Sequence, residues 1–396
     1  MLFDFIKRNK QQDFVVIDSI FPQKEPYAFR NSEINEYFKK IKNFSSYTMY
    51  PMLPDSDAWF SHGYGMSFND FANNKKNYLN FYPDNKDRIL FLEEEKKYNF
   101  KLAYSFFLAE TYTLLPFYEK NKVPFVFVLY PGGAFGIDFN ESDKMLEKIF
   151  KSDYFSGVIV TQLITKDYLL TKKMCPDNKI FYIYGGFVQF NKNELGKKQL
   201  YKKDKNTFDI CFVANKYSLG GIDKGYDLFI ETAKMLCQKT TDIMFHVIGD
   251  FKSTEIDVSK INKRIKFYGI QKPTFLKEFY KKIDIFLSPN RPFSLFKGNF
   301  DGFPLGIDPI FCGVAGFVSD ELGMNNHYVD GKDIIIIKNN SNKIANKILF
   351  YYKNLRKLYK LSKEGQNLTQ KLFDIDYQID ERIKVFRKFV KIDLLN

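Results

Sequence analysis

The stretch "FDICFVAN" at residues 208–215 is an almost continuous apolar run with the length of a β-strand. It is followed by "GYDLFIETAKMLCQK" (225–239), in which apolar residues recur every three or four positions, and by a second apolar run, "IMFHVIGD" (243–250). Apolar runs that alternate with amphipathic helices are typical of parallel strands covered by helices on both faces of a sheet. These residues therefore predict a strand–helix–strand unit of an α/β domain.

The same alternation extends over most of the chain. Further strand-like runs occur at 264–270, 284–290, 313–320 and 333–339, and an earlier series occurs at 13–21, 45–52, 88–94, 101–109, 123–131, 156–162 and 180–186. A polar stretch, "NKNELGKKQLYKKDKNT" (191–207), separates the two series and predicts a linker. The tail predicts two helices, "SNKIANKILFYYKNLRKLYKLS" and "YQIDERIKVFRKFVKI". We therefore expect two Rossmann-like, doubly wound α/β domains that face a cleft, with ligands at the carboxyl ends of the strands.

Composition narrows the class of protein and of partner. A hydrophobic content of 45% with 27% charged residues in 396 residues is typical of a globular protein with two domains. We expect a cytoplasmic protein, because the chain lacks a long apolar run, a secretory signal layout and a disulfide or metal-ligand spacing of its four cysteines. The net charge of +13 fits an anionic partner, although a lysine-rich composition explains it equally well. No nucleic-acid-binding motif accompanies the charge, so we expect no nucleic acid.

Several motifs follow one another in the second half of the chain. They are "CFVAN" with "GIDKGYDLFIETAKML", then "FHVIGD", then "IKFYGIQKPTFLKEFYKKIDIFLSPN", and finally "DGFPLGIDPIFCGVAGFVSD". In this order they resemble the C-terminal half of the retaining GT-B glycosyltransferases of group 1 (family four) type. The likeness covers residues 207–340 well and extends more weakly into the first half through "VPFVFVLYPGG" and "IFYIYGGF".

The resemblance also implies a domain layout. An acceptor-binding Rossmann-like domain would span 1–190, followed by the linker at 191–207. A nucleotide-sugar-binding domain would span 208–372, and a C-terminal helix at 373–396 would cross back to the first domain.

The chemistry of a sugar nucleotide points to cations in the second domain. Its two phosphates gain negative charge as the glycosidic bond breaks, and without a metal that charge is stabilised by Lys, Arg and helix N-terminal N–H groups. Lys224, in "DKGY" at the start of a helix, is the main catalytic candidate, and Gly225 would let the backbone approach the donor closely. Lys216 is the second donor-binding candidate, where the family usually has Arg. The alternative for Lys224 is a solvated lysine, which the helix dipole disfavours.

The two acids of the last motif have different predicted roles. The resemblance places Asp301 near the donor sugar and its anomeric carbon, as a catalytic residue, and Asp308 near the ribose of the nucleotide. Both are Asp where the family mostly has Glu, and one residue fewer lies between them. Asp301 also fits a turn-forming Asp-Gly, and Asp308, before a proline, equally fits the N-cap of a short helix. The turn between them adds the donor-binding candidates Gly302, Phe303 and Pro304.

The remaining candidates come from loops that follow strands. Tyr268, Gly269 and Ile270 occupy the place of the family's base-binding loop, and "PGGAFG" (131–136) should present Gly132 and Gly133 to the cleft. Tyr130 stands where the family frequently has His, and its hydroxyl could bind the transferred sugar. An aromatic loop, "DAWFSHGYGMSFND" (57–70), suits an acceptor sugar through Trp59 and His62, although Trp59 fits a hydrophobic anchor equally well. The acceptor-binding candidates are therefore Tyr130, Gly132, Gly133, Trp59 and His62.

Together these features predict a retaining glycosyltransferase. It would move a hexose-like unit from a nucleoside-diphosphate sugar to a glycan or lipid-linked acceptor in surface polysaccharide synthesis, with no metal and no other cofactor. Peripheral contact with the anionic inner face of the membrane would follow from the basic exterior. A sugar-nucleotide epimerase and a catalytically inactive nucleotide-sugar- or glycan-binding protein of the same fold are the alternatives.

Overall fold

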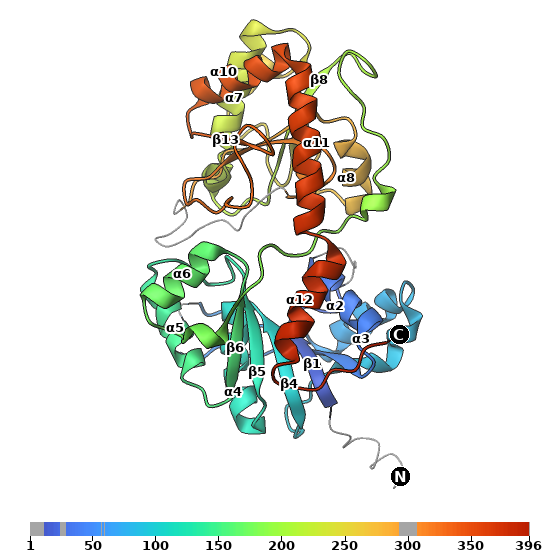
Figure 1. Cartoon of the computed structure of the whole chain (residues 1–396), viewed down its shortest axis with the longest axis vertical. Helices are drawn as coiled ribbons and strands as arrows, with labels where there is room; N and C mark the ends of the chain where they lie inside the picture. Colours follow the sequence, from blue (N-terminus) through green and yellow to red (C-terminus); the bar gives the residue numbers. More distant parts are fainter. Residues whose placement is uncertain (1–11, 24–28, 57, 59, 293–306, 396) are drawn as a thin grey trace. The chain divides into compact units, whose positions relative to one another are not determined.

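The computed structural model describes residues 12–23, 29–56, 58, 60–292 and 307–395, and the chain divides into two compact units (Figure 1). The first unit comprises Met1–Phe187 together with Ile375–Asn396, and the second comprises Val188–Asp374.

The described part of the first unit is built on a seven-stranded parallel sheet with the order β3-β2-β1-β4-β5-β6-β7. Its strands are β1 (Gln12–Asp18), β2 (Phe44–Thr48), β3 (Ile89–Phe91), β4 (Phe100–Phe106), β5 (Phe125–Leu129), β6 (Phe155–Val160) and β7 (Ile180–Tyr182). Its helices are α2 (Phe29–Lys40), α3 (Phe68–Leu79), α4 (Leu108–Asn121), α5 (Asn140–Phe150), α6 (Leu163–Thr171) and α12 (Ile375–Phe386). The order reverses between β1 and β4, which is where doubly wound sheets bind ligands.

The described part of the second unit holds a six-stranded parallel sheet with the order β10-β9-β8-β11-β12-β13. Its strands are β8 (Phe208–Val213), β9 (Ile243–Ile248), β10 (Ile265–Phe267), β11 (Ile285–Ser288), β12 (Ala315–Ser319) and β13 (Ile335–Ile337). Its helices are α7 (Tyr226–Lys239), α8 (Pro273–Tyr280), α9 (Ile307–Phe311), α10 (Ser341–Lys353) and α11 (Leu355–Leu372). Here the order reverses between β8 and β11.

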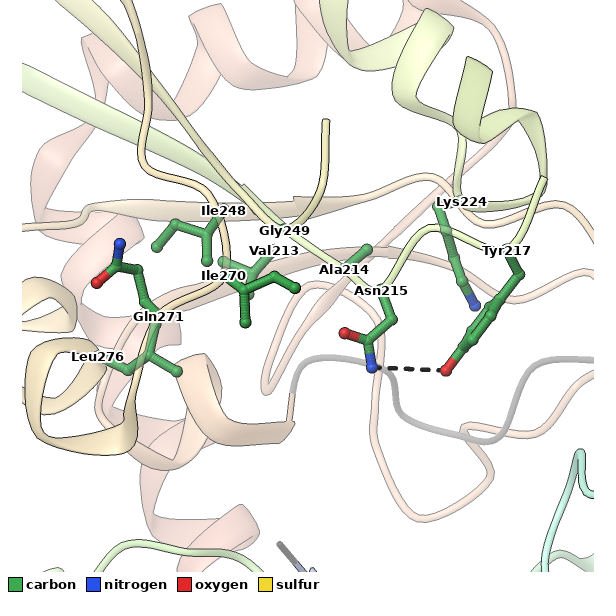
Figure 2. A pocket seen from close by; sticks show the side chains of 10 residues that line it. All are labelled: Val213, Ala214, Asn215, Tyr217, Lys224, Ile248, Gly249, Ile270, Gln271 and Leu276. Atoms are coloured by element: carbon green, nitrogen blue, oxygen red, sulfur yellow. Dashed lines mark hydrogen bonds between the residues drawn. The ribbon is translucent and has the colours of Figure 1, made fainter. Parts of the chain in front are cut away.

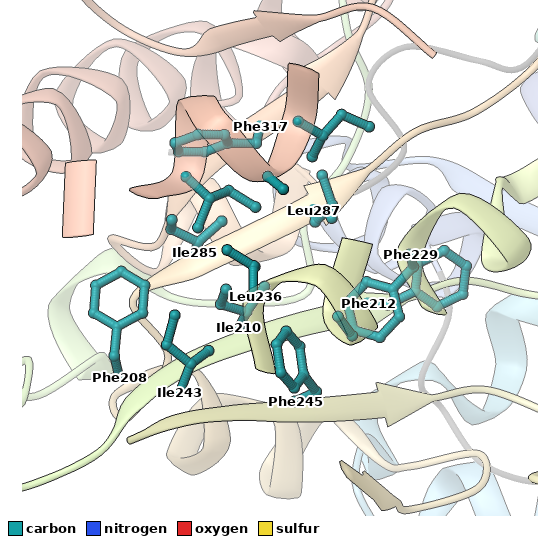
Figure 3. Packing of buried hydrophobic residues seen from close by; sticks show 14 of the residues in the cluster. Phe208, Ile210, Phe212, Phe229, Leu236, Ile243, Phe245, Ile285, Leu287 and Phe317 are labelled. Atoms are coloured by element: carbon teal, nitrogen blue, oxygen red, sulfur yellow. The ribbon is translucent and has the colours of Figure 1, made fainter. Parts of the chain in front are cut away.

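Burial on both faces explains why the strands are nearly continuous apolar runs. Every residue of β5 is buried, and so is every residue of β2 and β11. In the second unit, Phe212, Phe245 and Leu287 meet in one core with Phe229 and Leu236 of α7 (Figure 3). The expected strand–helix–strand unit at 208–250 is therefore confirmed as β8, α7 and β9.

The tail differs from the expected pair of helices. Asn354 has φ −124° and ψ 59°, outside the helical region, and ends the first predicted helix. The residues after it continue as α11, so that the tail forms α10, α11 and α12. The apolar period alone did not reveal the break, because the repeat runs through Asn354 almost in phase.

The polar stretch at 191–207 is partly embedded in the second unit. The Tyr201 side chain lies in the core, and its hydroxyl donates to Asp242. The Lys198 ammonium donates to the carbonyls of Tyr280 and Ile283, and burial lowers the pKa of Lys198 to about 8. These contacts fix the second half of the stretch on the unit that follows it.

The last helix, α12, packs in the first unit beside α2. The Phe386 ring stacks on Phe14 of β1 with ring centres 4.5 Å apart. Arg382 and Glu33 of α2 are both fully buried, with the guanidinium Nε 3.2 Å from Oε1 of Glu33. The Glu33 carboxylate also accepts hydrogen bonds from the hydroxyls of Tyr37, Tyr104 and Tyr130. The C-terminal segment is thus joined to the first unit by ring packing and a buried polar network.

Candidate functional site

A pocket of about 230 Å³ opens at the carboxyl ends of β8 and β9 in the second unit (Figure 2). The described residues that line it are Val213, Ala214, Asn215, Tyr217, Lys224, Ile248, Gly249, Ile270, Gln271 and Leu276. Apolar side chains occupy one end, around Ile248, Ile270 and Leu276, and polar groups of Asn215, Tyr217 and Lys224 occupy the other (Figure 2). An apolar end joined to a polar end is the arrangement expected for a base and its phosphates.

Two glycines bring the ends of three strands together at this edge. Gly225 has φ +71°, and a Cβ built on it would lie 2.1 Å from the carbonyl oxygen of Pro289, after β11. Gly249 has φ +123°, and its Cβ would lie 2.1 Å from the carbonyl oxygen of Ala214, after β8. Both positions therefore require glycine, by conformation and by space. For Gly225 the structure gives a reason that differs from the predicted one: the glycine lets the helix start pack on the end of β11.

Lys224 lies at the polar end of the pocket, at the end of a 3₁₀ turn (Leu219–Lys224) that leads into α7. Its side chain is only 2% exposed, with the ammonium 3.9 Å from Oδ2 of Asp223 and 5.0 Å from the centre of the Tyr217 ring. The Asp223 carboxylate also accepts a hydrogen bond from the Ser218 hydroxyl. The structure excludes the alternative of a solvated lysine, because the ammonium is held inside the turn beside the pocket.

The second predicted cation is placed differently. The Lys216 ammonium forms an ion pair with Glu255, which raises its pKa, and Lys216 is not among the described residues that line the pocket. Its donor-binding role stays a prediction, with the ammonium already engaged by a carboxylate.

Only the end of the predicted base-binding loop lines the pocket. Tyr268 is turned toward His246, whose Nδ1 lies 2.9 Å from the Tyr268 hydroxyl, and the other ring nitrogen of His246 lies 2.8 Å from Asp209. The Gly269 carbonyl accepts the N–H of Gly249 at 3.0 Å. Ile270 and Gln271, the next residues, line the pocket.

Asp308 lies inside α9 rather than before it. The expectation of an N-cap is therefore wrong, because the helix already includes Ile307. Burial raises the pKa of Asp308 to about 7, and its backbone carbonyl accepts the N–H of Cys312 at 3.0 Å. Asp308 is not among the described pocket residues, so ribose binding stays a prediction. Other predicted residues, namely Asp301, Gly302, Phe303, Pro304 and Trp59, lie outside the described residues.

In the first unit the predicted acceptor residues lie in loops after β2 and β5. The Tyr130 ring is buried, and its hydroxyl donates to Glu33 and accepts from Arg382. Gly133 has φ +54°, and a Cβ there would lie 2.5 Å from the Phe107 ring, whereas the space beside Gly132 is open. His62 is exposed, with Nε2 3.2 Å from the Tyr64 hydroxyl. Tyr130 thus belongs to the internal network of this unit, while Gly132 and His62 lie where a ligand can approach.

The structure adds a cluster that we did not predict. Asp18 ends β1 and Glu110 lies in the first turn of α4, so the two acids stand on either side of the reversal in strand order. Arg30 Nη1 lies 2.8 Å from the Asp18 carboxylate and 2.9 Å from the Glu110 carboxylate. Burial raises the pKa of Glu110 to about 7, and its Oε1 has no hydrogen-bond partner among the described residues. The signal in the sequence was the position of one acid at the end of a buried strand and of the other shortly after one.

The pocket residues Asn215, Tyr217 and Gln271 also escaped prediction, although each lies in a loop that follows a strand. Within the described ranges, no group of three or more His, Cys, Asp or Glu is placed to hold a metal ion. None of the helices in the part of the chain that the structure describes is long and apolar enough to cross a membrane.

Comparison with known proteins gives matches to both sequence and fold. Residues 197–368 match the family model of the glycosyl transferases group 1. Among solved structures, HepE from Anabaena, in complex with UDP and glucose, is 14% identical with a TM-score of 0.65, covering 96% of this chain and 100% of that chain. A glycosyltransferase from Rickettsia africae is 13% identical with a TM-score of 0.64, covering 96% of this chain and 99% of that chain.

Sucrose-phosphate synthase from Thermosynechococcus elongatus is 11% identical with a TM-score of 0.62, covering 95% of this chain and 98% of that chain. A search among curated proteins gives no match. The predicted resemblance is confirmed by these matches. The protein thus has the two-domain GT-B fold, and residues 197–368 are similar to the glycosyl transferases group 1.

Proposed function

We propose that this protein of GT-B fold is a retaining glycosyltransferase that binds a nucleoside-diphosphate sugar in the pocket of its second unit. The observation that carries the proposal is the buried Lys224 ammonium at the polar end of that pocket, directly before α7. A fixed cation beside a helix N-terminus suits a diphosphate. Solved structures of similar fold contain UDP with glucose or UDP-glucose, which makes UDP-glucose the first donor to test.

The proposed reaction needs two bond changes at one carbon of the sugar. The bond from the anomeric carbon to the diphosphate oxygen breaks, and the electron pair leaves with the diphosphate. The acceptor hydroxyl attacks from the same face, and its proton passes to the departing phosphate oxygen, so the anomeric configuration is kept. Lys224 and the N–H groups at the start of α7 would stabilise the charge that grows on the diphosphate.

The acceptor is proposed to be a glycan or a lipid-linked sugar, bound by the first unit in surface polysaccharide synthesis on the cytoplasmic side of the membrane. Because Lys224 and the helix supply the positive charge, we expect transfer to persist in the presence of EDTA.

The proposal is tested with matched ligands and matched lysine variants. Affinities of UDP, UMP and uridine are measured by calorimetry for the wild type, Lys224→Gln and Lys216→Gln. Loss of one charge-assisted contact of about 1.5–3 kcal/mol predicts roughly ten- to hundredfold weaker UDP binding for Lys224→Gln, with uridine unchanged. Lys216→Gln is expected to bind UDP nearly as well, because its ammonium pairs with Glu255. Equal losses for both variants would contradict the placement of the diphosphate.

Turnover separates transfer from the alternatives. UDP-glucose is incubated with and without a panel of sugar acceptors, and the anomeric configuration of the product is read by NMR. We expect a product only with an acceptor, with the configuration of the donor kept. Conversion of the donor alone into another sugar nucleotide would indicate an epimerase, and an inverted product would refute retention.

A further inference from the structure

The positive charge of the protein is concentrated in two helices of the second unit. Residues 341–372, which form α10 and α11, contain eight basic residues and one acidic residue, Glu364, for a net charge of +7. The whole chain carries +13, so the other 364 residues together carry only +6. A general lysine-rich composition does not explain such a local excess.

The cations of α11 lie on one side of the helix. The residues of α11 that are buried against the unit are Leu358, Leu361, Ser362, Gly365 and Thr369. The exposed cations are Arg356, Lys357, Lys360, Lys363 and Lys371, which we call the basic face. At 100° per residue, the buried set and the basic face project from opposite sides of the helix. The basic face runs for about 22 Å along α11, at 1.5 Å per residue.

The one carboxylate of α11, Glu364, projects from the same side as these cations but forms no ion pair with them. Among the described residues, no carboxylate lies within ion-pair distance of the five side chains, and Lys363 donates instead to the neutral amide oxygen of Gln366 at 3.2 Å. Helices elsewhere in the protein do pair their lysines, as Lys384 does with Glu381 at 2.6 Å. The basic face therefore presents its charge to solvent.

An exposed aromatic side chain lies at one end of the basic face. Phe350 of α10 is 47% exposed, and the Lys357 ammonium lies 5.2 Å from the centre of its ring. Lys353 at the end of α10 is also exposed. A row of cations with an apolar ring beside it is typical of helices that lie on an anionic lipid surface, where the cations meet head groups and the ring enters the boundary of the acyl chains.

We propose that the basic face of α11, with Phe350, docks the second unit on an anionic membrane surface. The inference rests on the proposed function in that a lipid-linked acceptor would be presented at such a surface. Charge complementarity and the exposed ring support a lipid surface. A single-stranded nucleic acid would instead call for several aromatic rings along the cations as a stacking platform. The long α11, on which the basic face lies, is seen in Figure 1.

The test compares vesicle binding of the full-length protein and two triple variants. Vesicles contain phosphatidylcholine alone or with about one third phosphatidylglycerol, and bound protein is measured by co-sedimentation at low and high salt. Arg356→Gln, Lys360→Gln and Lys363→Gln together remove three charges of the basic face. The matched control replaces Lys260, Lys263 and Lys266, three exposed lysines of the same unit, by Gln.

Wild type is expected to bind the anionic vesicles, to release them in high salt and to ignore neutral vesicles. At about 1 kcal/mol per basic residue near the surface, the triple variant of α11 should partition roughly a hundredfold more weakly, and the control should bind like the wild type. Phe350→Ser should weaken binding in both salt conditions, because it removes apolar insertion rather than charge. Equal losses in both triple variants, or no preference for anionic lipid, would overturn the proposal. Tighter binding of RNA than of vesicles through the same three residues would overturn it as well.

Transfer to a water-soluble acceptor is measured in the same preparations. We expect all of these variants to transfer at the wild-type rate, since none of the substituted residues lines the pocket. A wild type that transfers sugar but does not bind anionic vesicles refutes only the docking surface, whereas a wild type that binds the vesicles but transfers no sugar refutes only the proposed function.

Discussion

Replacement of Arg382 by Met should destabilise the first unit strongly. The Arg382 side chain is fully buried, and it joins α12 to α2 through Glu33, whose Oε1 lies 3.2 Å from Nε. Its Nη1 donates to the side-chain oxygen of Gln378 at 2.7 Å, and its Nη2 donates to the Tyr130 hydroxyl at 3.2 Å. Methionine fills much of the volume but leaves the Glu33 charge buried without a cation. Removal of one partner from a buried ion pair costs about 3–5 kcal/mol.

Unfolding of the full chain in urea is followed by far-UV circular dichroism, and the first unit contributes the transition that the variant should shift. A loss of 3–5 kcal/mol lowers the unfolding midpoint by about 1 M urea or more at an m-value of about 3 kcal/mol/M. Lys384→Met is the matched control, because Lys384 lies on the same helix and forms an exposed pair with Glu381. That control should leave the unfolding midpoint almost unchanged, because the pair is exposed to solvent.

The pH dependence adds a second check. Burial raises the pKa of Glu33 above its ordinary value, and the charge of Arg382 opposes that rise. Without Arg382 the pKa of Glu33 is higher in the folded state. At low pH Glu33 of the variant is therefore protonated and neutral, which removes the cost of a buried unpaired charge. Stability of Arg382→Met relative to the wild type should therefore fall as the pH rises from 5 toward 8. Addition of Glu33→Gln to Arg382→Met should recover part of the loss. A cost below about 1 kcal/mol, or one equal to that of Lys384→Met, would refute the reasoning.

Three further changes test other parts of the structure. Gly225→Ala should destabilise the second unit by about 2–4 kcal/mol in calorimetry, because its Cβ would meet the Pro289 carbonyl. Gly220 has a similar φ but lies in open space, so Gly220→Ala should cost only about 1–2 kcal/mol. Equal costs of the two variants would contradict the close approach at Gly225. Burial raises the pKa of Asp308 to about 7, so the stability of the wild type should decline between about pH 4 and 7, by at most about 1.4 kcal/mol per pH unit. Asp308→Asn should remove this decline. Parallel profiles of melting temperature against pH for the two proteins would speak against it. Glu110→Gln should lower the free energy of unfolding less at pH 8 than at pH 5, because burial raises the pKa of Glu110 to about 7 and disfavours its ionised form in the fold. Urea unfolding at the two pH values checks this order. A larger loss at pH 8 would contradict it.

Much of the fold follows from local pattern. The apolar run at 208–213 and the helical period at 226–239 reappear as β8 and α7, because a strand buried on both faces must be apolar throughout and a helix buries one stripe. The position of Lys224 before that helix was equally local, and it indeed lies beside the pocket. The helix break at Asn354 could not be predicted from local pattern, because the apolar repeat hardly changes phase there.

Contacts between distant segments required the tertiary structure. The glycine at 225 was predicted from its neighbours in sequence, yet what demands it is the carbonyl of Pro289, 64 positions away, which the order of β8 and β11 brings within 2.1 Å of the missing Cβ. The pairing of Lys216 with Glu255, and the sharing of Arg30 by Asp18 and Glu110, likewise depend on which strand ends become neighbours. The sequence by itself determined the alternation of strands and helices, since periodicity is local. Which side chains meet was decided by the strand order and the loop paths, which no local pattern contains.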